Sequence, residues 1–194
     1  MGIRSAMGRG VLRLGGWSFE GSVPRLRRYV LIAAPHTSNW DFVLMMAMAF
    51  ALDIPISWFG KSSLFHSPLG WLFRALGGIS ADRDRSTNLV EQSVARFAAD
   101  QDLVLVVPAE ATRAAGTQWR SGFYHIARLA NVPIVLGYLD YARKKGGLGL
   151  AVRPSGDVRA DMDRIREFYA DKRGRYPELF TTPRLREEDD DQSR

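Results

Sequence analysis

The sequence of 194 residues contains no cysteine. This absence excludes disulfides, thiolate nucleophiles and zinc sites built from cysteine. Histidine is scarce as well, because only His36, His66 and His125 occur, without a cluster or an HExxH arrangement. No transition-metal site is therefore expected. Any chemistry must come from single histidines, hydroxyls, carboxylates and basic side chains.

Long hydrophobic runs are also missing. The longest, residues 42–52, is far shorter than the roughly 20 residues that cross the hydrocarbon core of a bilayer. The basic start of the chain lacks the apolar stretch and the small-residue cleavage site of a secretory signal. These features predict a protein that stays in the cytoplasm.

Acidic residues are few outside the C-terminal tail. The formal net charge is +6, and the tail EEDDDQSR carries five acids and one arginine, so the rest of the chain is near +10. A body this basic attracts nucleic acid, an anionic membrane surface or a phosphorylated small molecule.

The chain has 46% hydrophobic residues and no internal repeat, as expected for one globular domain of this length. We expect a basic amphipathic segment at residues 1–27, the domain at 28–180 and an acidic disordered tail at 181–194. In the first segment, Ile3, Met7, Val11 and Leu14 recur at helical spacing. Such a helix lies either on a membrane or on the core of the domain.

Short apolar runs alternate with helical patterns along the domain. Strands are expected at residues 29–34, 54–60, 78–84, 102–108, 133–141 and 147–152. Helices are expected at residues 40–52, 63–78 (broken around Pro68 and Gly70), 86–100, 121–132 and 157–172. This alternation predicts an α/β fold, a single domain with a mainly parallel central sheet flanked by helices on both faces.

The octapeptide PHTSNWDF, residues 35–42, interrupts this apolar pattern. His36 follows a predicted strand, and open α/β sheets bind ligands at the carboxyl ends of their strands. Asp41, one turn into the next helix, can accept a hydrogen bond from one imidazole nitrogen and raise the basicity of the other. His36 is therefore a candidate general base. The alternative is a structural role, with Asp41 stabilising the N-terminus of its helix.

Three cations follow other predicted strands: Lys61, Arg83 and Arg113. Cations that converge above one edge of a sheet form a phosphate site, for which arginine offers bidentate hydrogen bonds. The alternative is that each is a solvated surface charge.

Four blocks, HTSNWD, GGISADRD, AEATR and VPIVLG, resemble in order and spacing the motifs of the glycerolipid acyltransferase family, which includes 1-acyl-sn-glycerol-3-phosphate acyltransferases. The resemblance covers roughly residues 28–140, and four ordered blocks are far more specific than one. It implies a glycerol-3-phosphate acyltransferase-like fold and a role in phospholipid biosynthesis. The implied reaction transfers a fatty acyl group from acyl-CoA or acyl carrier protein to a hydroxyl of a lysophosphatidic acid-like acceptor.

By this resemblance, His36 and Asp41 are the catalytic pair, and no acyl-enzyme forms. Lys61, Arg83, Glu110 and Arg113 match the positions that hold the phosphate or organise the acceptor, and Pro133 marks the acyl-donor side. No cofactor is implied beyond the co-substrate. The implied partners are a lipid acceptor and an anionic membrane surface, with peripheral association at its inner face and no nucleic acid.

The third block departs from the usual PEGTR of the family. Ala111 replaces its glycine, and the added β-carbon disfavours positive φ. A different acceptor, such as a lyso-ornithine lipid or a glycolipid, therefore stays open. Two further alternatives are a thioester hydrolase, although no GxSxG motif is present, and a nucleic-acid-binding module, although no known signature of one appears.

Overall fold

A seven-stranded sheet with the order β1-β7-β6-β2-β5-β3-β4 forms the centre of the molecule. The computed structural model describes residues 2–81, 86–110 and 116–190. Neighbouring strands are parallel, except that β6 and β7 are antiparallel. The strands are β1 (Ser18–Glu20), β2 (Arg28–Ala34), β3 (Ile56–Lys61), β4 (Gly78–Ala81), β5 (Leu103–Val107), β6 (Ile134–Asp140) and β7 (Lys145–Val152). The predicted fold class, a single α/β domain with a mainly parallel sheet, is confirmed.

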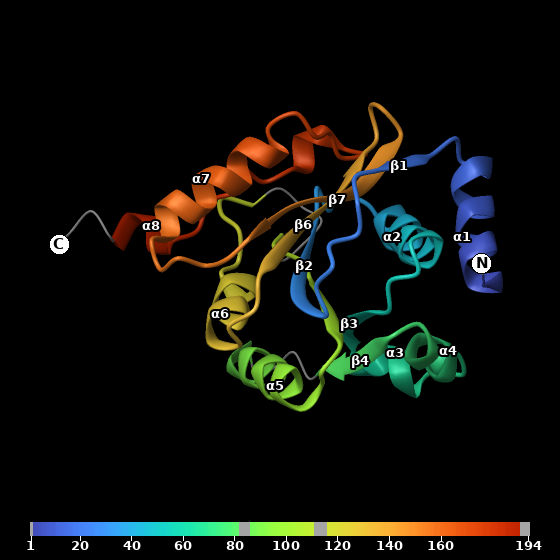
Figure 1. Ribbon diagram of the computed structural model, residues 1–194, viewed down its shortest axis with the longest axis horizontal. Coiled ribbons are helices and arrows are strands. Elements are labelled where there is room, and N and C mark those ends of the chain that lie inside the picture. Colours follow the sequence, from blue (N-terminus) through green and yellow to red (C-terminus); the bar gives the residue numbers. More distant parts are fainter. Residues whose placement is uncertain (1, 82–85, 111–115, 191–194) are drawn as a thin grey trace.

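Helices cover both faces of this sheet. They are α1 (Ile3–Leu14), α2 (Trp40–Ala51), α3 (Ser62–His66), α4 (Gly70–Ala75), α5 (Ser86–Ala99), α6 (Gly122–Leu129), α7 (Val158–Tyr169), the 3-10 turn η1 (Pro177–Leu179) and α8 (Glu187–Asp190). Figure 1 shows α2, α3 and α4 on one side of the sheet and α5, α6 and α7 on the other, with α1 outside α2. The break predicted around Pro68 separates α3 from α4.

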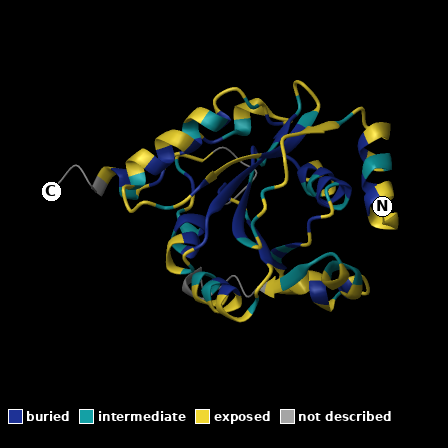
Figure 2. Ribbon diagram, in the orientation of Figure 1, coloured by how far each residue is buried: buried dark blue, intermediate teal, exposed yellow. Residues whose placement is uncertain are grey.

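Alternating side chains of the central strands build a core on each face. In β2, Val30 and Ile32 face α5, α6 and α7, whereas Tyr29 and Leu31 face α2. A strand that is buried on both faces reads as a continuous apolar run, which is why the sequence revealed it. Figure 2 shows these central strands as buried.

The N-terminal residues belong to the same body, which corrects the expected separation of residues 1–27. Gly8 of α1 lies so close to α2 that a β-carbon would come within 2.4 Å of the carbonyl oxygen of Ala47. The Ser5 hydroxyl donates a hydrogen bond to the carbonyl of Ala51 (3.1 Å), and β1 pairs with β7. Strand β1 was not predicted, because it has only three residues, all exposed.

The disordered tail predicted at residues 181–194 is wrong for the part that the structure describes. Leu185 is fully buried, and its backbone N–H donates to the carboxylate of Glu188 (2.7 Å). Glu188 is also buried and accepts a hydrogen bond from Arg166 of α7 (2.7 Å). The charge run in the sequence hid the burial of Leu185 in the core and the contact of Glu188 with Arg166, because both depend on elements elsewhere in the chain. Residues 191–194 lie outside the described part.

Candidate active site

The loop between β2 and α2 places His36 at the carboxyl edge of the sheet, as predicted. Asp41 lies in the first turn of α2 and is only 4% exposed. One of its oxygens, Oδ2, accepts hydrogen bonds from the backbone N–H groups of Thr37 and Ser38, both at 2.8 Å. A carboxylate is favoured at this end of a helix by the positive end of the helix dipole. The short loop is thus folded around the carboxylate.

The imidazole of His36 contacts the same carboxylate oxygen, with 3.3 Å between Nδ1 and Oδ2 of Asp41. The His36 side chain is partly exposed, whereas that of Asp41 is buried. A carboxylate at Nδ1 favours the tautomer in which Nδ1 carries the hydrogen and Nε2 holds a free lone pair. The pair is therefore arranged to accept a proton at Nε2.

Glu110 follows β5 and fixes the His36 loop from the neighbouring strand. Its Oε1 accepts a hydrogen bond from the backbone N–H of His36 (2.7 Å), and its Oε2 accepts one from the backbone N–H of Thr181 (3.1 Å). Burial raises the pKa of Glu110, and the two backbone donors oppose that shift. By the family resemblance, Glu110 was expected to organise the acceptor. In the structure its carboxylate holds the histidine backbone, and a role toward the acceptor stays a prediction.

Tyr141 completes the surroundings of the carboxylate and was missed by the sequence analysis. Its hydroxyl donates a hydrogen bond to Oδ1 of Asp41 (2.6 Å). Burial raises the pKa of Tyr141, and the negative charge of Asp41 raises it further, so the phenol stays protonated at neutral pH. The available signal was its position as the last residue of the strand predicted at 133–141, at the edge of the sheet where His36 lies.

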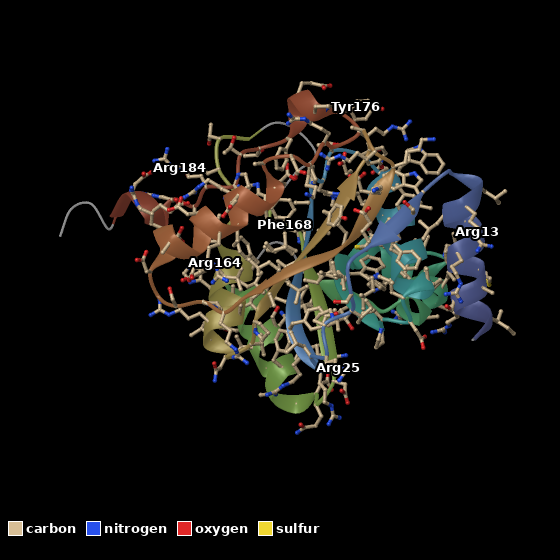
Figure 3. The ribbon with its side chains drawn as sticks, turned by 45° about the horizontal axis from the view of Figure 1, so that its top comes forward. Arg13, Arg25, Arg164, Phe168, Tyr176 and Arg184 are labelled. Atoms are coloured by element: carbon tan, nitrogen blue, oxygen red, sulfur yellow. The ribbon has the colours of Figure 1, made fainter. Side chains whose placement is uncertain are left out.

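The segment after α7 crosses the same edge and was also missed. The backbone N–H of Tyr176 donates to the hydroxyl of Thr37 (3.2 Å), and a β-carbon at Gly174 would come within 2.7 Å of that hydroxyl. Tyr176 is labelled at the top of Figure 3, in the segment between α7 and η1. Residues 174–181 therefore brace the loop that carries the histidine.

An apolar cavity of about 590 Å³ opens beside this loop. It lies between α2 and the sheet and reaches from His36 and Asp41 to Leu52, at the opposite end of α2. At 1.5 Å per residue, this run of α2 is about 16 Å long. Its lining is mostly apolar and includes Leu31, Phe42, Met45, Ala49, Trp58, Phe73 and Leu148. Ligand pockets of small molecules commonly have such a volume and lining.

Of the three predicted cations, the described residues include only Lys61. Lys61, at the end of β3, is exposed and lines the cavity that also contains His36. Arg83 and Arg113 lie outside the described residues, as does Ala111. Pro133 lies at the other edge of the sheet, where its carbonyl accepts a hydrogen bond from the backbone N–H of Val30 (3.0 Å). It does not line the cavity, so its assignment to the donor side stays a prediction.

Two comparisons with known proteins agree with this geometry. The family model named Acyltransferase matches residues 19–136. The crystal structure of the 1-acyl-sn-glycerophosphate (LPA) acyltransferase PlsC from Thermotoga maritima is similar with a TM-score of 0.60 and 16% sequence identity, over 87% of this chain and 77% of that one. At this identity the likeness shows a common fold. No curated protein sequence matches the chain significantly.

Proposed function

The chain belongs to the Acyltransferase family, and from this premise we propose that it transfers a fatty acyl group from a thioester to a hydroxyl of a lysophosphatidic acid-like acceptor. One observation carries the proposal: a histidine–aspartate pair stands at the end of an apolar cavity that follows α2. The pair supplies a base for the hydroxyl, and the cavity supplies a site for a hydrocarbon chain.

The proposed reaction begins at Nε2 of His36. This nitrogen removes the proton of the acceptor hydroxyl as the oxygen attacks the thioester carbonyl, and Asp41 stabilises the imidazolium that forms. When the tetrahedral intermediate collapses, the C–S bond breaks and the imidazolium returns the proton to the departing thiolate. No acyl-enzyme is needed, which agrees with the lack of cysteine in the chain.

The cavity suits the acyl chain rather than a polar group. Transfer of each methylene from water to an apolar site is favourable by about 0.8 kcal/mol. A chain seated along α2 would hold its thioester near His36, at the polar end of the cavity. The donor is acyl-CoA or acyl carrier protein.

The acceptor is proposed to be anionic. Lys61 lines the same cavity as His36, and the basic body of the chain attracts phosphorylated ligands. Arg83 and Arg113 are proposed to join Lys61 at the phosphate. An acceptor without glycerophosphate, such as a lyso-ornithine lipid or a glycolipid, is the alternative that the altered third block leaves open.

The acceptor dependence of thioester cleavage tests this function. We expect purified protein to release CoA from a long-chain acyl-CoA only when lysophosphatidic acid is present, with one acylated lipid formed per thiol. Because the chain has no cysteine, a thiol reagent reports the released CoA alone, and mass spectrometry identifies the lipid. Equally fast thiol release without an acceptor, with free fatty acid as the product, would instead show a hydrolase.

Peripheral membrane binding is the second part of the proposal. Helix α1 packs on α2 through Ser5, Gly8 and Leu12, and its outer face carries four exposed apolar side chains: Ile3, Met7, Val11 and Leu14. Arginines flank this face, among them Arg13, which is labelled in Figure 3. An apolar helix face with basic neighbours is typical of binding to anionic lipid surfaces. No helix within the described residues is long and apolar enough to cross a membrane.

Replacing Met7 and Leu14 by Glu together is expected to lower binding to phosphatidylcholine–phosphatidylglycerol vesicles at least about 10-fold. Each side chain gains about 1.5–3 kcal/mol when it is fully buried, and the added charges are repelled by anionic lipid. Vesicle co-sedimentation measures the effect. Leu129→Glu, at an exposed leucine of α6 on the other side of the sheet, is the control that should bind normally. Equal binding by all three proteins would exclude this face.

A further inference from the structure

We propose that Tyr141 is a positioning residue for the histidine–aspartate pair and sets the pH range in which His36 acts as a base. The inference rests on the proposed function and extends it to a residue outside the region that the family model matches, residues 19–136. Tyr141 acts through Asp41, because it is the carboxylate and not the imidazole that its hydroxyl contacts.

The two oxygens of Asp41 have different partners. Oδ2 accepts the N–H groups of Thr37 and Ser38 and contacts His36, whereas the described partner of Oδ1 is the hydroxyl of Tyr141. The N–H groups of Thr37 and Ser38 thus keep Oδ2 toward the imidazole, and the phenol holds the second oxygen of the carboxylate. Hydrogen bonds to a charged acceptor are the strong ones, and a distance of 2.6 Å is typical of them.

Tyr141 is itself held from three sides. It follows β6, which lies beside β2 in the sheet. Its ring packs edge-on against Trp17, with 4.9 Å between centroids. Its backbone N–H donates to the carbonyl of Arg173, in the segment after α7 (2.9 Å). A side chain held in this way is suited to fixing a partner.

The hydrogen bond from Tyr141 to Asp41 also affects the basicity of the histidine–aspartate pair. The phenol withdraws charge from the carboxylate, and so it stabilises the ionised form of Asp41 and weakens its hold on an imidazolium. Without the phenol, protonation of Asp41 and protonation of His36 both become easier, and each inactivates the pair. Both effects move the acid limb of the activity profile to higher pH. Other titratable or charged groups near the pair include Lys61 and Tyr138, which line the same cavity, and Glu110, Arg175 and Tyr176.

Tyr141→Phe keeps the ring and its packing on Trp17 but removes the hydroxyl. We expect kcat to fall about 10-fold, as for the loss of a hydrogen bond to a charged group, with KM for donor and acceptor unchanged. We expect the acid limb of kcat/KM to rise by about 0.5–1 pH unit. In the Asp41→Asn background, Tyr141→Phe should add little, because its effect passes through that carboxylate.

Tyr124→Phe is the matched control. Tyr124 also donates to a buried aspartate, Asp161 (2.8 Å), but between α6 and α7 on the other face of the sheet. This variant should lose stability and keep the pH profile of the wild type. A profile that is likewise unchanged in Tyr141→Phe would overturn the positioning role, even if the wild type proves to be an acyltransferase.

A measurement made without substrate tests the role of Tyr141 separately from the proposed acyltransferase function. NMR titration of the imidazole of His36, assigned by its absence in His36→Ala, should show a higher midpoint in Tyr141→Phe and an unchanged one in Tyr124→Phe. This shift would support the role of Tyr141 even if no acyl transfer is detected. An unchanged midpoint in both variants would contradict it.

Discussion

Asp41→Asn is expected to lower kcat by about 100-fold or more, because a neutral amide no longer stabilises the imidazolium of His36. The fold should persist. The amide oxygen of Asn can accept the N–H groups of Thr37 and Ser38, and its NH₂ group can donate to the hydroxyl of Tyr141, so each present contact of the carboxylate keeps a partner. The substitution thus removes the negative charge from the site, while the hydrogen bonds that hold the loop remain. Steady-state kinetics, with circular dichroism for the fold, measure both consequences.

Asp161→Asn separates this effect from the general cost of losing a buried carboxylate. Asp161 is 3% exposed and accepts hydrogen bonds from the hydroxyl of Tyr124 and the backbone N–H of Ser155 (2.8 and 2.7 Å). It therefore resembles Asp41 in burial and partners but lacks a histidine. We expect Asp161→Asn to retain kcat. A wild-type kcat for Asp41→Asn, or equal losses in both variants, would show that Asp41 serves only the structure.

Local sequence patterns were sufficient to predict most of the fold. Buried parallel strands such as β2 and β5 are short apolar runs, and α2 follows directly as a run of good helix formers. The position of His36 at a strand end and the reach of Asp41 across one helical turn are also local properties. A spacing of five residues was therefore enough to place this pair.

The residues that hold the pair could not be predicted in the same way. Tyr141 and Thr181 reach the site from positions 100 and 71 residues away from their partners Asp41 and Glu110. Nothing local in the sequence links them, because their contacts depend on which strands become neighbours. The acidic composition of the C-terminal residues concealed Leu185 for the same reason.

The cavity was the largest omission of the sequence analysis. Residues 40–52 were predicted to form a helix, and much of α2 is buried. Periodicity shows which side of a helix is apolar, but it does not show whether the opposing sheet fills the space beneath it. Met45 and Ala49 line a space that remains open, and only the three-dimensional packing reveals it.

His36→Ala tests most directly whether this histidine is the general base. The substitution removes the imidazole, while the backbone N–H that Glu110 holds remains available. The loop should therefore keep its shape, and the apolar lining of the cavity is unchanged. Loss of a general base costs about 100-fold or more in rate. His125→Ala, at a partly exposed histidine of α6, is the matched control.

The deciding measurement is kcat for lysophosphatidic acid acylation by wild type, His36→Ala and His125→Ala at one pH near neutrality. The expected result is a loss of at least about 100-fold in His36→Ala alone, with donor binding unchanged. Turnover by His36→Ala at the rate of the wild type would contradict the general-base role of His36.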